Sequence, residues 1–164
     1  MIRTLAIGIL STLILPAMLA CEKLPDPIVP DPPQEEQNEG KENTMPETIK
    51  ITISGKTLPV KIEDNEATNA LVAALREASI TYEAHDYGGF EKVGPLGRSL
   101  PASDTQITTQ AGDVILYSGN QIVLFYGSNT WSYTRIGKMQ YESLDELKSF
   151  LKADEGNISV TLSL

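Results

Sequence analysis

The chain has 164 residues and a formal net charge of −9, with one cysteine and one histidine. The acidic balance argues against a nucleic-acid partner, because phosphate binding needs clustered Lys and Arg. One cysteine excludes an internal disulfide, and one histidine argues against a zinc site, so we expect no metal and no cofactor. The length suits one domain stabilised by its own hydrophobic core.

The N-terminus has the pattern of an export signal. Arg3 precedes an apolar run over residues 5–20, and the only cysteine, Cys21, follows that run directly. A positive start, an apolar stretch and small residues before a cleavage point make a secretory signal. Cys21 at this boundary resembles the lipobox of bacterial lipoproteins, although Met18 and Leu19 replace its usual residues. We predict a lipoprotein signal peptide over 1–20, lipidation of Cys21 and anchoring to a membrane of the bacterial cell envelope; the alternative is an ordinary signal or short anchor with an incidental cysteine.

Residues 21–47 have the composition of a tether. The segment after Cys21 carries eight acidic residues against two lysines, and six prolines are spread along it. Proline removes backbone donors, and low hydrophobicity with excess charge cannot offset the entropy of ordering. We therefore place the folded domain at 48–164. We expect this domain to be monomeric.

The first half of the domain predicts a hairpin and a helix. Residues 49–53 alternate apolar and polar side chains, Gly55 suits a tight turn, and residues 57–62 supply the second strand. Asn65 then offers a helix cap, and apolar residues at helical spacing predict a helix over 65–78.

The second half predicts more strands and one short helix. Residues 81–109 form a Gly-rich strand-and-loop region, followed by a hairpin of 113–117 and 121–127 and a strand over 131–139. The run 114–117 has almost no polar face, which predicts burial on both sides. A capping-box pattern at Ser143 predicts a helix to about residue 152 that buries Leu144, Leu147 and Leu151, and residues 158–164 alternate again. Many short strands with two helices favour a closed barrel, because closure removes exposed edges.

The segments A-G-D-V-I-L-Y, I-V-L-F-Y-G and R-I-G-K begin at Ala111, Ile122 and Arg135. With the order of elements, they resemble the small bacterial cyclophilin-like domains. The resemblance implies a mainly β fold, a closed antiparallel cyclophilin-like barrel of about eight strands capped by two helices.

The resemblance also raises the question of prolyl isomerase activity. True cyclophilins carry a Phe-His-Arg segment whose Arg polarises the prolyl amide, and the nearest equivalent by order is Phe90-Glu91-Lys92. Lys92 would stand where the Arg belongs, and an ammonium does not replace a planar guanidinium. We therefore expect no catalytic residues and a non-enzymatic module that binds a small molecule or peptide; the alternative is a degenerate prolyl isomerase acting on exported proteins.

An aromatic and polar set is the candidate binding groove. Aromatic side chains with a few polar tips are typical of binding patches. The predicted groove residues are Phe90, Lys92, Tyr126, Trp131, Tyr133 and Arg135. The structural alternatives are that Arg135 pairs with Asp113 or Glu91 and that Trp131 covers a barrel end.

Two further motifs are expected to have structural and not catalytic or phosphate-binding roles. His85 precedes Asp86, but no nucleophile accompanies them, and a solvated loop histidine is favoured over a catalytic pair. The glycines between Gly88 and Gly97 lack the Lys-Ser/Thr of a phosphate loop, so they are expected to serve turns.

Overall fold

A computed structural model describes residues 44–164. The predicted signal peptide, Cys21 and the tether up to residue 43 lie outside the described residues. None of the helices in 44–164 has the length and hydrophobicity needed to cross a membrane. The elements are β1 (Thr48–Ile53), β2 (Lys56–Ile62), α1 (Glu66–Glu77), β3 (Ile80–Tyr87), β4 (Glu91–Pro95), β5 (Thr105–Thr108), β6 (Asp113–Tyr117), β7 (Gln121–Phe125), β8 (Thr130–Met139), α2 (Leu144–Leu151) and β9 (Ile158–Ser163).

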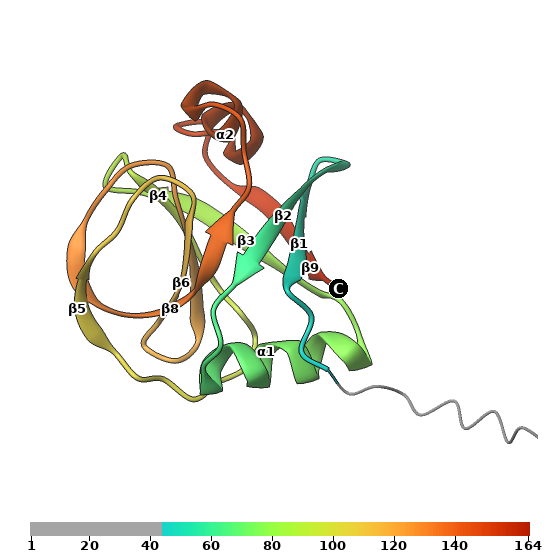
Figure 1. Cartoon of the computed structure of the whole chain (residues 1–164). Coiled ribbons are helices and arrows are strands. Elements are labelled where there is room, and N and C mark those ends of the chain that lie inside the picture. The colour runs from blue at the N-terminus through green and yellow to red at the C-terminus, as the bar shows by residue number, and fades with distance from the viewer. Residues whose placement is uncertain (1–43) are drawn as a thin grey trace, which may run out of the picture. The chain divides into compact units, whose positions relative to one another are not determined.

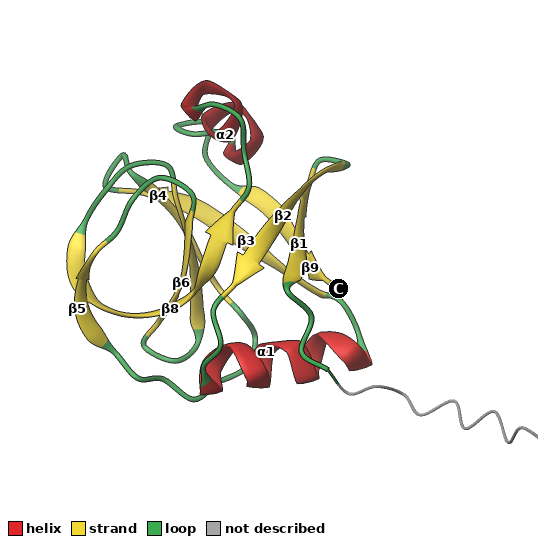
Figure 2. Cartoon of the chain, viewed as in Figure 1, coloured by secondary structure: helices red, strands yellow, loops and turns green. Residues whose placement is uncertain are grey.

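Eight of these strands form a closed antiparallel barrel. Their order is β2-β1-β9-β3-β4-β7-β6-β8, and pairing of β2 with β8, for example Val60 with Met139, closes the ring. The two helices lie at opposite ends of this barrel (Figure 2). The predicted mainly β barrel of about eight strands with two helices is confirmed.

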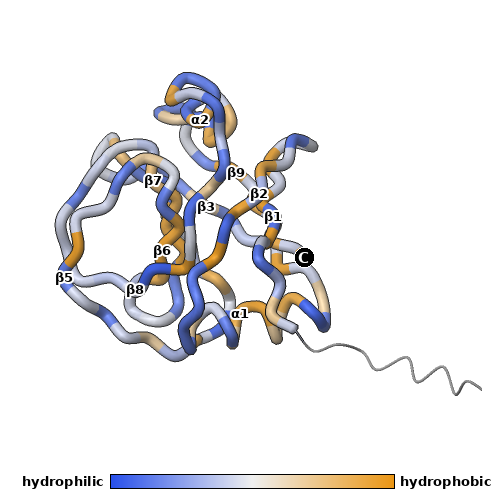
Figure 3. Tube along the Cα trace, in the orientation of Figure 1, coloured by the Kyte–Doolittle hydropathy of each residue, from blue (hydrophilic) through white to orange (hydrophobic). Residues whose placement is uncertain are grey.

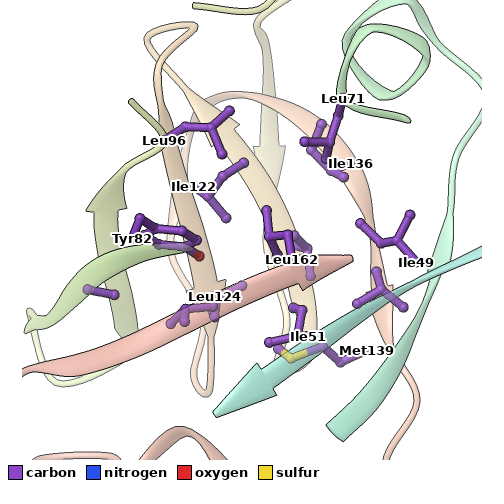
Figure 4. Packing of buried hydrophobic residues seen from close by; sticks show 14 of the residues in the cluster. Ile49, Ile51, Leu71, Tyr82, Leu96, Ile122, Leu124, Ile136, Met139 and Leu162 are labelled. Carbon is purple, nitrogen blue, oxygen red and sulfur yellow. The ribbon is translucent and has the colours of Figure 1, made fainter. Parts of the chain in front are cut away.

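The barrel interior is the main hydrophobic core. The alternation in β1 places Ile49, Ile51 and Ile53 inside, all buried, as the sequence predicted. Side chains from strands far apart in sequence, such as Leu124 and Leu162, meet them there (Figure 4). Because the strands contribute alternate residues to this one cluster, their register is fixed by burial.

The helix α1 begins at the predicted cap. The Asn65 Oδ1 accepts from the Thr68 backbone N–H at 3.0 Å, and the Asn65 Nδ2 donates to the Arg135 carbonyl at 2.8 Å. The first bond satisfies a free amide of the first turn, and the second ties the helix to β8. Leu71 and Leu75, on the inward face of α1, are buried as expected.

The helix α2 differs from its prediction in one side chain. Ser143 caps it, since its Oγ accepts from the Glu146 backbone N–H at 3.2 Å, and Leu147 and Leu151 are buried. Leu144, predicted to be buried, is 45% exposed, and Phe150 is buried instead. Leu144 is the first residue of α2, whereas Phe150 lies one turn after Leu147, on the face of the helix that joins the core cluster.

An arm extends from the barrel. The first half of β8 leaves the barrel and pairs with β5, the one strand outside the ring of eight. Thr130 is paired with Thr108, and Tyr133 with Thr105. The register of β6 against β8 shifts between Val114 and Ile115, a bulge that lets β8 bend. In Figure 1 this arm arches away from β1 and β2. We call β5 and residues 130–133 of β8 the arm.

The arm explains why β6 is buried on both sides. A second hydrophobic cluster lies on the outer face of the barrel wall, with Tyr133 of the arm packed over it. Its buried members are Val93, Ile115, Val123, Phe125 and Tyr133. Hydrophobic residues gather along β6 and its neighbours in Figure 3, whereas the arm is mostly neutral or hydrophilic. The predicted two-sided burial of residues 114–116 is therefore confirmed, with Tyr117 partly buried.

Candidate functional site

A cavity lies on the outer face of the barrel, next to the second cluster. Its volume is about 410 Å³, within the size range of small-molecule sites. Strands β3, β4, β6 and β7 supply its floor, and the arm with the turn before it supplies one wall. The lining residues are His85, Tyr87, Glu91, Val93, Tyr117, Gln121, Val123, Asn129, Trp131 and Tyr133.

Four of the ten lining residues are tyrosine or tryptophan. Tyr133 meets Tyr117 edge to face, with ring centroids 5.9 Å apart, and meets Phe125 at 5.8 Å in a similar arrangement. Phe90 stacks on Phe125 at 6.2 Å and supports this group from the side. Trp131, on the arm, remains 56% exposed although it lines the cavity. The cavity thus has a packed aromatic interior and an open aromatic rim.

Tyr133 is held by the turn that precedes the arm. The Asn129 Nδ2 donates to the Tyr133 hydroxyl at 2.9 Å. Asn129 is itself fixed by Thr109, whose Oγ1 accepts from the Asn129 N–H at 2.9 Å. Burial raises the pKa of the Tyr133 hydroxyl, so it stays protonated. Since Asn129 uses one acceptor position of this hydroxyl, the hydroxyl hydrogen remains available to a ligand.

Glu91 is the one acidic residue that lines the cavity. Its side chain is on the outer face of β4, the residue is only 6% exposed, and its Oε2 has no hydrogen-bond partner. Burial raises the pKa of Glu91 from 4.5 to about 7, because the charged carboxylate loses its hydration there. A buried carboxyl without a partner is costly and is found more often at functional sites than elsewhere.

Lys92 and Tyr126 lie on the opposite side of the barrel wall. Lys92 is fully buried, and its Nζ is 2.7 Å from the Asp86 Oδ2 and donates to the Gly156 carbonyl at 2.6 Å. The Tyr126 hydroxyl donates to the Asp86 Oδ1 at 3.0 Å. Burial alone would raise the pKa of Asp86, but Lys92 and the backbone amides of Gly156 and Asp154 outweigh it and lower that pKa. No member of this network lines the cavity.

Arg135 shares the outer face of β8 with Tyr133 but does not line the cavity. Its Nη1 is 2.7 Å from the Asp113 Oδ2, and its Nε is 3.4 Å from the Glu63 Oε1. Asp113 is almost completely buried, so Arg135 balances a buried charge. The structural alternative from the sequence, pairing with Asp113, is confirmed.

Of the six predicted groove residues, the structure therefore brings two into the cavity, Trp131 and Tyr133. Phe90 supports the cavity from the side, and Lys92, Tyr126 and Arg135 belong to other contacts. Sequence reasoning missed Glu91, together with Tyr87 and Tyr117. The available signal was strand alternation, since Glu91 and Lys92 are neighbours and must point to opposite faces.

The remaining motifs have simple structural roles. His85 is exposed, as predicted, but it lies on strand β3 and not in a loop, and it lines the cavity. Asp86 points to the interior network, so the two do not form a catalytic pair. Gly88, Gly89 and Gly97 have positive φ values and serve turns, as expected. For Gly94 the expectation was wrong, because it lies within β4, where the missing side chain makes room for the Glu83 carbonyl of β3. Within residues 44–164, His, Asp and Glu form no group of three that could hold a metal ion.

The sequence profile of the Cyclophilin-like family matches residues 51–163, and the protein belongs to this family. No curated protein matches.

Two solved structures match about 70% of this chain. One is the solution structure of the hypothetical protein AF2241 from Archaeoglobus fulgidus, with 17% identity, a TM-score of 0.48, and coverage of 71% of this chain and 92% of that one. The other is McbB in complex with tryptophan, with 13% identity, a TM-score of 0.46, and coverage of 70% of this chain and 44% of that one. This chain thus spans less than half of the McbB chain. Likeness at this level carries no argument about function.

Proposed function

We propose that this protein is a non-enzymatic binding module that takes a small molecule or an extended peptide in the cavity on the outer face of its barrel. The observation that carries the proposal is the cavity itself, about 410 Å³ in volume and lined by aromatic, apolar and a few polar side chains. Apolar surface supplies affinity and sparse polar groups supply orientation, which is the usual composition of a ligand site. Tyr and Trp add contact area at little entropic cost.

The alternative, a degenerate prolyl isomerase, is not favoured by the cavity. Neither Arg nor Lys is among the residues that line it, so no fixed cation is available to polarise a prolyl amide. Lys92, the residue in the expected sequence position, is buried on the other face in its pair with Asp86. We expect no acceleration of prolyl isomerisation by the purified protein. Catalysis that is lost in Trp131→Ala would place isomerase activity in this cavity and overturn the non-enzymatic assignment.

Binding can be tested through Trp131, the only tryptophan of the chain. Ligands from a screen of small molecules and peptides should raise the melting temperature and change the Trp131 emission, because stabilisation follows RT ln(1 + [L]/Kd). Trp131→Ala should abolish the thermal shift. Leu144→Ala is the matched control, since Leu144 is also an exposed apolar side chain but lies on α2. Equal shifts in both variants would mean that ligands bind elsewhere.

We also propose that the module is held at the bacterial cell envelope by a lipid on Cys21. The support is the position of the only cysteine directly after the apolar run. Labelled palmitate should enter the wild-type protein and the membrane fraction should contain it, whereas Cys21→Ala should lose the label. An unlabelled wild type would refute the anchor and leave the binding proposal untouched.

A further inference from the structure

One carboxyl oxygen of Glu91 has no hydrogen-bond partner within the protein. Its carboxyl lines the cavity, the residue is only 6% exposed, and Oε2 makes no hydrogen bond. The nearest cation in sequence, Lys92, faces the other side and is bound to Asp86. Arg135, on the same outer face, is bound to Asp113 and Glu63. The fold therefore leaves this buried oxygen able to accept a hydrogen bond from a ligand in the cavity.

Resting on the proposed function, we propose that the cavity is specific for small organic molecules that carry a primary ammonium group, with Glu91 as the counter-ion. A primary ammonium supplies N–H donors for the orphan oxygen and a positive charge for the carboxylate, and such charge-assisted bonds are about twice as strong as neutral ones. A quaternary ammonium would supply the charge without the donors. Anionic ligands are disfavoured, because the lining contains a carboxyl and no Arg or Lys.

The walls suit the same ligand class. Tyr117, Tyr133 and Trp131 line the cavity, and aromatic faces attract ammonium groups. Val93 and Val123 supply apolar surface beside them, which suits an apolar or aromatic body attached to the amine. The volume of about 410 Å³ is at the lower end of ligand cavities, so the molecule is small.

The site also predicts a pH dependence. The ammonium binds the ionised form of Glu91, whose pKa in the free protein is about 7. Affinity should then rise about tenfold between pH 6 and pH 8, since an alkylammonium with a pKa near that of Lys, about 10.4, stays charged throughout. The other titratable groups that face the cavity are His85 and Tyr87 from β3, Tyr117 from β6 and Tyr133 from β8, while β7 offers Gln121. His85 is the only basic side chain among them.

The test compares phenethylamine with 2-phenylethanol, its neutral counterpart, by calorimetry and Trp131 fluorescence on the whole protein. We expect at least tenfold tighter binding of the amine at pH 8, a fall of about tenfold at pH 6, and release of a proton on binding at pH 6. Glu83→Gln, which removes an exposed carboxyl on β3 that does not line the cavity, should keep all three. Glu91→Gln, which keeps the shape of the side chain, should reduce the preference for the amine below threefold and abolish proton release.

The outcomes separate the inference from the function on which it rests. Equal binding of amine and alcohol by the wild type, or an amine preference that persists in Glu91→Gln, overturns the ammonium specificity and leaves a binding cavity in place. Absence of amine binding also overturns it, while hits of other chemistry in the wider screen would still support the binding module. Circular dichroism of Glu91→Gln checks that the variant is folded, and proton release by the wild type is a second readout that does not depend on that variant.

Discussion

Glu91→Gln should stabilise the protein at neutral pH and do little in mild acid. The wild-type carboxyl is buried with one oxygen unpartnered, and its pKa is raised from 4.5 to about 7. Between these two values the folded state binds more protons than the unfolded state, so the stability of the wild type falls as the pH rises. Above about pH 7 the loss is complete and constant.

The size of the effect follows from the shift. Each pKa unit corresponds to about 1.4 kcal/mol, so the ionised carboxyl costs the folded state about 3 kcal/mol relative to its protonated form. The amide side chain of the Glu91→Gln variant cannot ionise. The variant's advantage in unfolding free energy over the wild type should therefore be small at pH 4.5 and grow to about 3 kcal/mol by pH 8. The opposite shift of Asp86 is present in both proteins and cancels in the difference.

The assay is urea unfolding of both proteins at several pH values from 4.5 to 8, followed by circular dichroism. Glu83→Gln is the matched control, because Glu83 is an exposed carboxyl on the neighbouring strand β3. Its removal takes away the same charge and should give a pH profile of stability parallel to that of the wild type. If Glu91→Gln also runs parallel to the wild type across this range, Glu91 is not a buried orphan and the reasoning about the cavity is wrong.

Three other substitutions test the fold by urea unfolding. Leu116→Ala should cost about 2 to 5 kcal/mol, because Leu116 is fully buried in the interior cluster; a cost within error would mean that the register of β6 is wrong. Lys92→Met should cost about 3 kcal/mol, since it leaves the Asp86 charge without its cation although three other donors remain, and adding Asp86→Asn should recover part of the loss. Gly94→Ala should cost about 3 kcal/mol or more, because the added methyl group would collide with the Glu83 carbonyl; a neutral result would contradict the close approach of β3 and β4.

The sequence by itself determined the local elements and the class of fold. The apolar alternation of Ile49, Ile51 and Ile53 was sufficient to define a strand with one buried face, and Asn65 and Ser143 marked the starts of both helices. These signals are local, since caps and periodicity act over a few residues. The resemblance to cyclophilin-like domains supplied the barrel, which the structure and the family profile confirm. The lipid on Cys21 stays a prediction.

Only the tertiary structure decided which face of each strand meets which neighbour. Alternation separates Glu91 from Lys92 but does not say which of them points into the barrel, and the interior pair of Lys92 with Asp86 settles it. The arm could not be predicted from the sequence either, because the bend in β8 accompanies a register shift against β6 and has no local residue signal. A cavity formed by strands distant in sequence depends on long-range pairing, and therefore Glu91 became a candidate ligand group only once the fold had brought the aromatic wall over it.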